Sequence, residues 1–276
     1  GEVHRRFKEI ETGELQETPG TTFKPYWVGN AAGKVAVLAR NNRTGQQVWS
    51  GQFGYPGDAA YREFHRKDGV SGMQYWAIGG PGTDLGDKPL YDPATARERV
   101  ESHADHFAGL VAEQLREYRE ETGAPGVIAS NYDTELFGHW WFEGVDWLKG
   151  VVRRLAQNDS VELLSATEMV EKYQPDLVAE LPESSWGAGG NDFTWMNPET
   201  EWMWPIIRDM ELRMEALVAA YPEADGARKQ ALDQAARELL LLQSSDWPFL
   251  VTTGQAKEYA TKRFRDHVGR FEEMAD

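Results

Sequence analysis

The sequence predicts an α/β domain followed by an all-helical domain, and three observations lead to this fold class. Short apolar runs alternate with helical patterns through the first part of the chain, which is typical of a parallel sheet with crossing helices. After about Pro182 the pattern changes to a stretch rich in Gly and Trp, ESSWGAGGNDFTWMNPETEW. Beyond it only helical periodicity returns, apart from the brief FLVTT. We therefore expect an α/β domain over residues 1–180 and a helical domain over residues 181–276.

The elements of the first part can be assigned in chain order. The first 25 or so residues are polar and predict an irregular arm. KVAVLAR, from Lys34 to Arg40, is apolar and β-branched enough for a buried strand, and NNRTG would turn the chain into QQVWS as the returning strand of a hairpin. GQFGYPGD predicts a loop, AAYREFHRK a short helix and GMQYWAI another strand.

A long helix is expected from Asp92-Pro93 to about Gly123. Asp and Pro suit the N-cap and the first turn, and apolar residues recur on one face at Val100, Ala104, Phe107, Val111 and Leu115. The segments that follow predict a buried strand (GVIAS), a helix (EGVDWLKGVVRRLAQND), a strand (VELLS) and a short helix (ATEMVEKYQP). In the second part, helices are expected near residues 198–221, 226–242 and 255–273.

Composition excludes several classes of function. Lys and Arg number 29 against 45 Asp and Glu, so the net charge of −16 argues against nucleic acid or an anionic membrane as the partner. The absence of cysteine excludes disulfides and thiolate metal sites, and no apolar run approaches the roughly 20 residues that span a bilayer. His103 and His106 lie on the long helix without a further histidine nearby in sequence, so we expect no metal site. We also expect no cofactor and a cytoplasmic protein. Gly1 in place of Met suggests a piece of a longer protein.

The stretch SNYDTELFGHWWFEG, from Ser130 to Gly144, carries the strongest chemical signal. Asp133 would lie just past the carboxyl end of the GVIA strand, the edge where active-site groups emerge in parallel α/β folds. From position alone, capping of the next turn is an equal alternative. Trp140 and Trp141 are adjacent, so we expect one to line a site and the other to join the core.

YDTELFGHWWFEG strongly resembles the motif around the acid/base aspartate of glycoside hydrolase family 57, especially its 1,4-α-glucan branching enzymes. The resemblance continues through QQVWS, GYPGDAAYREFHRK, PESSWGAGGNDFTW and SDWPFLVTTGQAKEYA, which occur in the family's order and cover nearly the whole chain. It implies a distorted seven-stranded (β/α) barrel followed by a helical C-terminal domain. Residues 1–180 would then be the C-terminal half of the barrel.

The chemistry of this family requires two carboxylic groups. The resemblance implies that Asp133 is the general acid/base, with a pKa raised by burial against tryptophans or by a nearby carboxylate. No segment between Gly1 and Lys34 resembles the family's motif for the nucleophilic glutamate or its early histidine motif. Four other carboxylates are expected to be structural or to position substrate: Glu135, Glu143, Glu183 and Asp192.

Sugar contacts also follow from the resemblance, because sugar rings present apolar faces to aromatic rings and hydroxyls to polar groups. The positions that match glucan-contacting residues of the family are Arg40, Trp49, Gly57, Trp186, Trp195, Asp246 and Gln255, and two further candidates are His139 and Trp140. The residues alone leave other roles open: core packing for the tryptophans, an ion pair for the arginine, a plain turn for the glycine, helix-end capping for Asp246 and Gln255, and a structural role for the histidine.

The leading hypothesis is a fragment of a 1,4-α-glucan branching enzyme, which in its complete form moves a glycosyl segment from an α-1,4 to an α-1,6 position in glycogen-type glucan synthesis. This chain alone is expected to be inactive. One alternative is an α-amylase or 4-α-glucanotransferase of the same family. The other is a non-catalytic homologue that only binds α-glucan. In each case the expected partner is an α-glucan.

Overall fold

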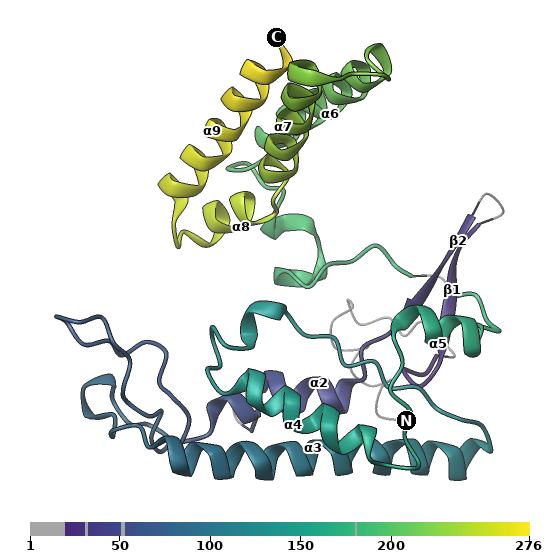
Figure 1. The fold of residues 1–276 in the computed structure, drawn as a ribbon, viewed down its shortest axis with the longest axis vertical. Coiled ribbons are helices and arrows are strands. Elements are labelled where there is room, and N and C mark those ends of the chain that lie inside the picture. Colours follow the sequence, from purple (N-terminus) through teal and green to yellow (C-terminus); the bar gives the residue numbers. More distant parts are fainter. Residues whose placement is uncertain (1–19, 31–32, 51–52, 180) are drawn as a thin grey trace. The chain divides into compact units, whose positions relative to one another are not determined.

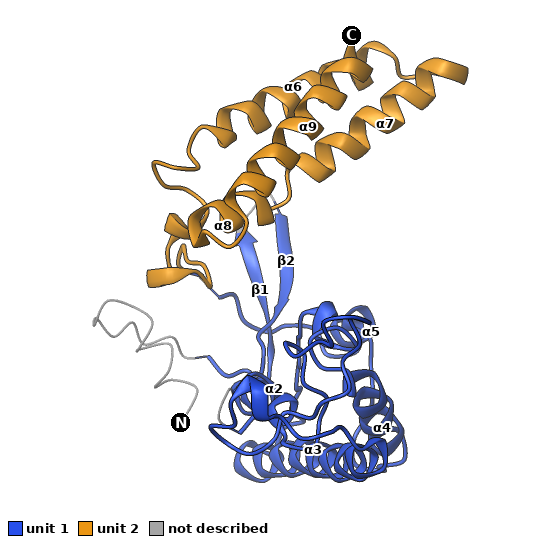
Figure 2. Ribbon diagram, turned by 90° about the vertical axis from the view of Figure 1, so that its left-hand side faces the viewer, with its two compact units in different colours: residues 1–7, 15–181 blue, residues 8–14, 182–276 orange. Residues whose placement is uncertain are grey.

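The computed structural model describes residues 20–179, except 31–32 and 51–52, and residues 181–276. The chain divides into two compact units, coloured blue and orange in Figure 2. Among the described residues, unit 1 ends at Leu181 and unit 2 begins at Pro182. Each unit has a hydrophobic core of its own. Most of the predicted irregular arm, residues 1–19, lies outside the described residues.

The regular sheet described in unit 1 is a two-stranded antiparallel ribbon of β1 (Pro25–Asn30) and β2 (Gly33–Leu38). β2 corresponds to the strand expected from KVAVLAR. Gly29 adopts a φ of 144°, and a Cβ atom there would lie 2.2 Å from the Gly33 carbonyl oxygen. The close approach of the two strands beside their connection therefore requires glycine.

Parallel pairing among the described residues of unit 1 consists of single bridges. Trp27 of β1 bridges Val178, and Arg40, just beyond β2, bridges Ala129. The expected strand GVIAS is thus reduced to one bridged residue, and VELLS forms no strand. A strand needs a neighbour that supplies hydrogen bonds along its length. Among the described residues, GVIAS has two such bonds to different segments, from the Val127 N–H to the Phe23 carbonyl and from the Asn41 N–H to the Ala129 carbonyl, and VELLS has none. A regular parallel sheet is therefore not formed by the described residues.

The hairpin expected at residues 34–50 is wrong, because its second half is a helix. α2 (Asn42–Trp49) follows β2 closely. Buried Asn41 caps this helix, and its side-chain oxygen accepts a hydrogen bond from the Thr44 N–H at 3.0 Å. Thr44 and Val48, four residues apart, are both buried, which is helical spacing. The cap and this buried face outweigh the turn signal of NNRTG.

The segment expected as a short helix, AAYREFHRK, is not helical either. Arg62 forms an antiparallel bridge with Ala77, and the Glu63 N–H donates to the Trp76 carbonyl at 2.8 Å. These bonds join the segment to the run GMQYWAI, which was expected to be a strand. The pairing covers too few residues for a regular strand, so both runs remain irregular backbone held by isolated bonds.

Two helices that lie side by side carry the core of unit 1 (Figure 1). α3 (Pro93–Thr122) begins at Asp92, whose carboxylate accepts hydrogen bonds from the backbone N–H groups of the next turn. It ends at Gly123, which has a left-handed φ of 73°. Both ends agree with the sequence prediction. α4 (Gly144–Ala156) was likewise expected and packs along α3.

Shorter helices complete unit 1. α5 (Ala166–Lys172) starts with the capping box formed by Ser165 and Glu168, as the pattern ATEMVEKYQP predicts. Single 3-10 turns occur at η1 (Tyr55–Gly57), η2 (Leu85–Asp87) and η3 (Thr134–Leu136). Aromatic rings fill the core between α3 and α4, notably Tyr55, Tyr61, Phe107, Trp141 and Trp147.

The regular elements described in unit 2 are all helical. They are η4 (Ala188–Gly190), η5 (Asp192–Thr194), α6 (Met203–Ala220), α7 (Gly226–Leu242), α8 (Asp246–Thr253) and α9 (Lys257–Ala275). α6, α7 and α9 correspond to the three expected helices, and FLVTT lies inside α8 rather than in a strand. A buried contact of 2.7 Å between Glu238 and His267 joins α7 to α9. No described helix is long and apolar enough to cross a membrane.

Candidate active site

The segment that leads to Asp133 is fixed on the start of α2. The Asn41 N–H donates to the Ala129 carbonyl at 2.9 Å, and the Tyr132 hydroxyl donates to the Thr44 carbonyl at 2.9 Å. Arg40 and Ala129 form a parallel bridge, so the two segments run in the same direction and the residues after each of them emerge on the same side. Asp133 therefore emerges close to where α2 begins.

Asp133 presents an exposed carboxylate. Its backbone carbonyl accepts the Leu136 N–H of η3 at 3.2 Å, but its side chain forms no capping bond. Within the described residues, this carboxylate has no hydrogen-bond or ion-pair partner. The alternative role as a side-chain cap is therefore not observed, and the carboxylate is accessible to a substrate.

The HWWFEG turn divides its two tryptophans between the core and the surface. Trp141 is 1% exposed and packs among the core aromatic rings, whereas Trp140 is 50% exposed. The Trp140 ring lies 4.4 Å from that of Phe64, and His139 meets Phe64 edge-on at 5.2 Å. Trp141 thus supports the turn from the core. The expected burial of Asp133 against tryptophans is wrong, since its carboxylate is exposed.

Glu143 is a buried carboxylate at the end of the same motif. Its Oε1 accepts the Arg62 N–H at 3.1 Å and so ties the irregular segment around Arg62 to the start of α4. This contact agrees with the structural role expected for it. The other carboxylates that the sequence singled out are exposed: Glu135, Glu183 and Asp192.

A hollow beside α2 brings two of the predicted sugar-contacting residues together. This α2 hollow has a volume of about 320 Å³, and its lining includes Arg40, Gly45, Gln46, Trp49 and Phe53. Trp49 is 43% exposed at the end of α2. The Arg40 side chain lies over Gly45, where a Cβ atom would meet its Cδ at 3.4 Å. An exposed indole can stack on a sugar face, and a guanidinium can donate to the sugar hydroxyls.

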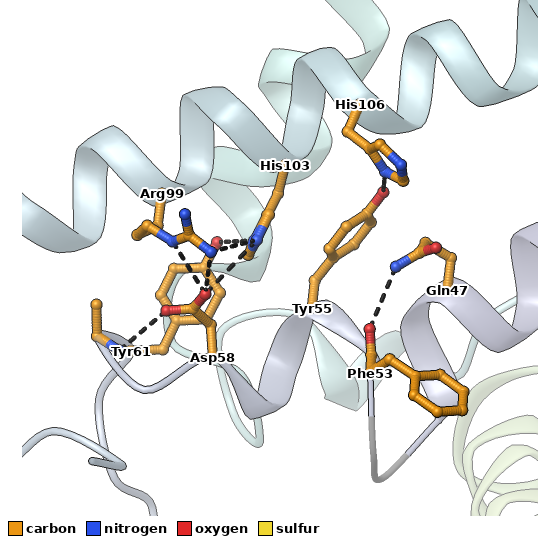
Figure 3. Close-up of polar contacts among 9 residues, drawn as sticks. Gln47, Phe53, Tyr55, Asp58, Tyr61, Arg99, His103 and His106 are labelled. Atoms are coloured by element: carbon orange, nitrogen blue, oxygen red, sulfur yellow. Dashed lines mark hydrogen bonds and ion pairs between the residues drawn. The ribbon is translucent and has the colours of Figure 1, made fainter. Parts of the chain in front are cut away.

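A second hollow lies between α3 and the residues around η1 (Figure 3). This α3 hollow has a volume of about 440 Å³, and its lining includes Gln47, Phe53, Gly57, Arg99, His103 and His106. Gly57, a third predicted sugar contact, is exposed, and a Cβ atom at this position would meet nothing within 4 Å. Its backbone is therefore open to a ligand on this side.

Side chains of α3 hold the chain on both sides of Gly57 (Figure 3). Arg99 Nη2 lies 2.7 Å from the Asp58 carboxylate, and Arg99 Nε lies 3.0 Å from the same oxygen. The Tyr55 hydroxyl lies 2.6 Å from Nδ1 of His106. The residues directly before and after the Pro56–Gly57 turn are thus fixed on α3, which limits the movement of the Gly57 backbone.

His103 is uncharged at neutral pH. Burial lowers its pKa to about 4, although the Asp58 carboxylate, 3.6 Å from Nε2, acts in the opposite direction. Its Nδ1 lies within hydrogen-bond distance of the Tyr61 hydroxyl, at 2.8 Å, and burial raises the pKa of Tyr61, so that this hydroxyl keeps its proton at neutral pH. Burial acts to raise the pKa of Asp58 as well, but hydrogen bonds from Arg99 and the Ala60 N–H hold it below its usual range. The cluster therefore supports the turn rather than transferring protons.

The predicted residues of unit 2 gather around α8. Trp186 is 79% exposed, and its ring lies 4.9 Å from Trp195 and 5.7 Å from Phe249 of α8. Asp246 is the first residue of α8, and its carboxylate accepts a hydrogen bond from the Ser244 hydroxyl at 3.0 Å. Gln255 is exposed in the connection that follows α8. The alternative of a helix-end capping role therefore stays open for Asp246. The rings of Trp186 and Trp195 contact each other.

Sequence reasoning missed Phe53, Phe249 and the support that α3 gives to Gly57. Phe53 lies in the predicted loop GQFGYPGD and Phe249 lies inside an apolar helix, and a single phenylalanine in either place carries no distinctive signal. The spacing of Arg99, His103 and His106 along α3 could have indicated a shared helical face. The described residues contain no group of three or more side chains that could hold a metal ion.

Comparison with known proteins agrees with the motifs. Residues 206–276 match the family described as 1,4-alpha-glucan branching enzyme, C-terminal. The chain is 50% identical over 263 residues to 1,4-alpha-glucan branching enzyme TK1436 of Thermococcus kodakarensis. The matched segment covers 95% of this chain and 38% of that protein. The chain is 36% identical over 257 residues to the probable 1,4-alpha-glucan branching enzyme Rv3031 of Mycobacterium tuberculosis, and this match covers 90% of this chain and 48% of that protein. The chain thus spans about half the length of these relatives, or less.

Solved structures show the same likeness. The crystal structure of TK1436, a GH57 branching enzyme in complex with glucose and additives, matches with a TM-score of 0.81 and covers 95% of this chain and 47% of that one. The GH57-type branching enzyme of Pyrococcus horikoshii, 45% identical, matches with a TM-score of 0.77 over 93% of this chain and 49% of that one. The alpha-amylase AmyC of Thermotoga maritima is 33% identical, with a TM-score of 0.70 over 92% of this chain and 50% of that one.

A unit of helices and a two-stranded ribbon followed by a helical unit is thus matched, over more than nine-tenths of the chain, by structures described as branching enzymes and an alpha-amylase, so the chain has the fold of part of such an enzyme. More particularly, the chain is similar over more than nine-tenths of its length to part of the branching enzymes of glycoside hydrolase family 57, and its residues 206–276 match the C-terminal model of 1,4-alpha-glucan branching enzymes. The resemblance of the YDTELFGHWWFEG motif and its companion segments is confirmed.

Proposed function

We propose that the complete protein is a 1,4-α-glucan branching enzyme. It would cut an α-1,4 link in a linear glucan and transfer the released segment to a 6-hydroxyl, as a cytoplasmic step of glycogen-type glucan synthesis. The observation that carries this proposal is the exposed, unpaired carboxylate of Asp133, in a chain that is 50% identical to a protein of that name.

Asp133 would act in both halves of the reaction. As an acid it donates its proton to the glycosidic oxygen while the bond to the anomeric carbon breaks, and a second carboxylate forms a glycosyl ester. As a base it then accepts the proton of the incoming 6-hydroxyl, whose oxygen displaces the ester. Sugar rings that cover the exposed carboxylate would remove it from water and favour its protonated form. We place the second carboxylate outside this chain, so the chain alone would be inactive.

Both units would contribute sugar contacts. In unit 1 these are Arg40 and Trp49 of the α2 hollow, Gly57 of the α3 hollow, and the exposed His139 and Trp140. In unit 2 they are Trp186, Trp195, Asp246 and Gln255 around α8. The exposure of Trp49, Trp140 and Trp186 supports this assignment, because core packing leaves no aromatic face for a ligand.

Unit 1 is proposed to be part of a distorted seven-stranded (β/α) barrel, with unit 2 as the helical C-terminal domain. The parallel bridges of Trp27 with Val178 and of Arg40 with Ala129 support this proposal, because a barrel of this kind is built from parallel neighbours. The likeness to about half of three longer enzymes supports it further.

A second candidate function is hydrolysis or 4-α-glucan transfer. The 33% identity to a protein named as an alpha-amylase favours it, and the same acid/base would serve. A protein that only binds α-glucan would not need an exposed carboxylate at Asp133, which argues against the non-catalytic alternative.

Replacement of Asp133 by Asn in the complete protein tests the catalytic role. Because Asn cannot donate or accept the proton, we expect turnover of amylose to fall by about 10²- to 10⁴-fold, while glucan binding persists. The matched control is Asp159→Asn, which makes the same change at an exposed carboxylate in the turn after α4 and should keep its activity.

The products separate the candidate functions. New α-1,6 links support branching, and shortened or exchanged linear chains support the amylase or 4-α-glucanotransferase. Binding without any turnover by the unaltered protein would establish the non-catalytic alternative. Full activity of the Asp133→Asn protein would remove the acid/base role.

A further inference from the structure

We infer that Phe53 is a sugar-stacking residue that joins the α2 hollow and the α3 hollow into one track for a linear α-glucan. The inference rests on the proposed function, since it concerns the path of that substrate along unit 1. Phe53 is 66% exposed and lines both hollows. It is none of the residues that the family resemblance points to.

The two hollows lie on neighbouring faces of α2. Gln46 lines the α2 hollow, and the next residue, Gln47, lines the α3 hollow. Consecutive residues of a helix point in directions about 100° apart, so the helix itself separates the hollows along its length. Phe53 lies beyond the end of the helix, where the α2 hollow and the α3 hollow meet. A chain that runs from Trp49 to Gly57 would therefore pass the Phe53 ring.

The backbone presents the Phe53 ring in a defined position. Its carbonyl accepts a hydrogen bond from Gln47 Nε2 at 3.2 Å (Figure 3), and its N–H donates to Ser50 Oγ at 3.3 Å. The next residue, Gly54, donates to the Ser50 carbonyl at 2.8 Å, and a Cβ atom there would lie 2.4 Å from the same oxygen. Glycine is thus required at position 54, directly before buried Tyr55. The backbone of Phe53 itself is held by Gln47 and Ser50.

The surroundings of Phe53 suit a carbohydrate better than an apolar partner. None of the described rings stacks on it, so its face is open. Polar side chains stand on either side, with Arg40 and Gln46 in the α2 hollow and Arg99 in the α3 hollow. A linear α-glucan offers an apolar face at each glucose and hydroxyls at its edges, which is the complement of an isolated ring between polar groups.

Binding of maltoheptaose to this chain, measured by isothermal titration calorimetry, tests the inference. Phe53→Ala should raise the Kd about three- to tenfold, the loss expected for one aromatic contact. Phe53→Trp should bind at least as tightly as the unaltered chain. Leu90→Ala, which truncates another exposed apolar side chain of unit 1 outside both hollows, should leave the Kd unchanged. Circular dichroism should show the same thermal unfolding for all variants, because Phe53 is mostly exposed.

Trp49→Ala makes the possible failures distinguishable. If Trp49→Ala weakens binding but Phe53→Ala does not, the inferred track is wrong and the proposed function stands. If neither the unaltered chain nor the complete protein binds maltoheptaose, the proposed substrate class is itself contradicted. If Phe53→Ala abolishes self-association instead of glucan binding, the ring serves a protein contact and the inference fails.

Discussion

Asp133 shows what a motif can and cannot predict at the scale of a residue. Its place after the apolar run GVIA predicted a position just past the carboxyl end of a strand. The hydrogen bond from the Asn41 N–H to the Ala129 carbonyl brings that run beside the start of α2. Its surroundings were predicted wrongly, because sequence adjacency to Trp140 and Trp141 does not specify where their rings point. Trp141 turns into the core and Trp140 to the surface. The Asp133 carboxylate is therefore exposed to water in this chain.

His103 predicts a pH dependence of folding stability. Its pKa is about 4 in the folded chain and about 6.5 when unfolded, so the unfolded chain binds more protons between these values. Its contribution is therefore complete above about pH 6.5 and is lost as the pH falls towards 4. The charged and titratable groups that face it are Asp58, Arg99, Tyr61, Tyr55 and His106.

Urea denaturation at pH 7.5 and pH 5.0, followed by circular dichroism, measures this contribution. Between pH 7.5 and pH 5.0, the free energy of unfolding of the unaltered chain should fall by up to about 2 kcal/mol more than that of His103→Gln, because the variant lacks the ionisable ring. The low pKa of Asp58 places its own titration at lower pH, where it affects both proteins. Equal losses in the two proteins would show that His103 does not remain neutral in the fold.

At the scale of elements, helices were predictable where their signals are local. α3 has its cap at Asp92 and its stop at Gly123, and α5 has the capping box of Ser165 and Glu168, all visible in the sequence. The run KVAVLAR predicted β2 correctly, but the strands predicted at GMQYWAI, GVIAS and VELLS are not formed, because a strand is defined by a partner that can lie far away in the chain. α2 was missed because Asn41 can start either a turn or a helix, and the burial of Val48 decides between them.

The contact between α3 and α4 depends on Gly150. A Cβ atom at this position would lie 2.9 Å from the Ala104 Cβ, closer than two carbon atoms pack. Gly150→Ala should therefore destabilise the chain by about 1–3 kcal/mol, despite the better helix propensity of alanine. The control is Gly109→Ala on α3, where nothing lies within 4 Å and a gain of up to about 1 kcal/mol is expected. Equal effects of the two substitutions on the urea midpoint would contradict the close packing.

At the scale of the whole molecule, the order of motifs was more informative than any element. The segments that resemble glycoside hydrolase family 57 run through both units, and the likeness of the chain to that family's branching enzymes covers more than nine-tenths of it. Local patterns could not show how the sheet continues, since the described residues contain two strands and isolated parallel bridges. The proposed function must therefore be tested on the reaction of the complete protein.

The formation of α-1,6 links is the direct test of the branching activity proposed for the complete protein. The complete protein would be incubated with linear amylose, and the branch points counted by nuclear magnetic resonance after removal of the protein. We expect new α-1,6 links that increase with time and are lost in Asp133→Asn. Amylose that is shortened or exchanged without any new α-1,6 links, or that remains unchanged, would contradict the proposal.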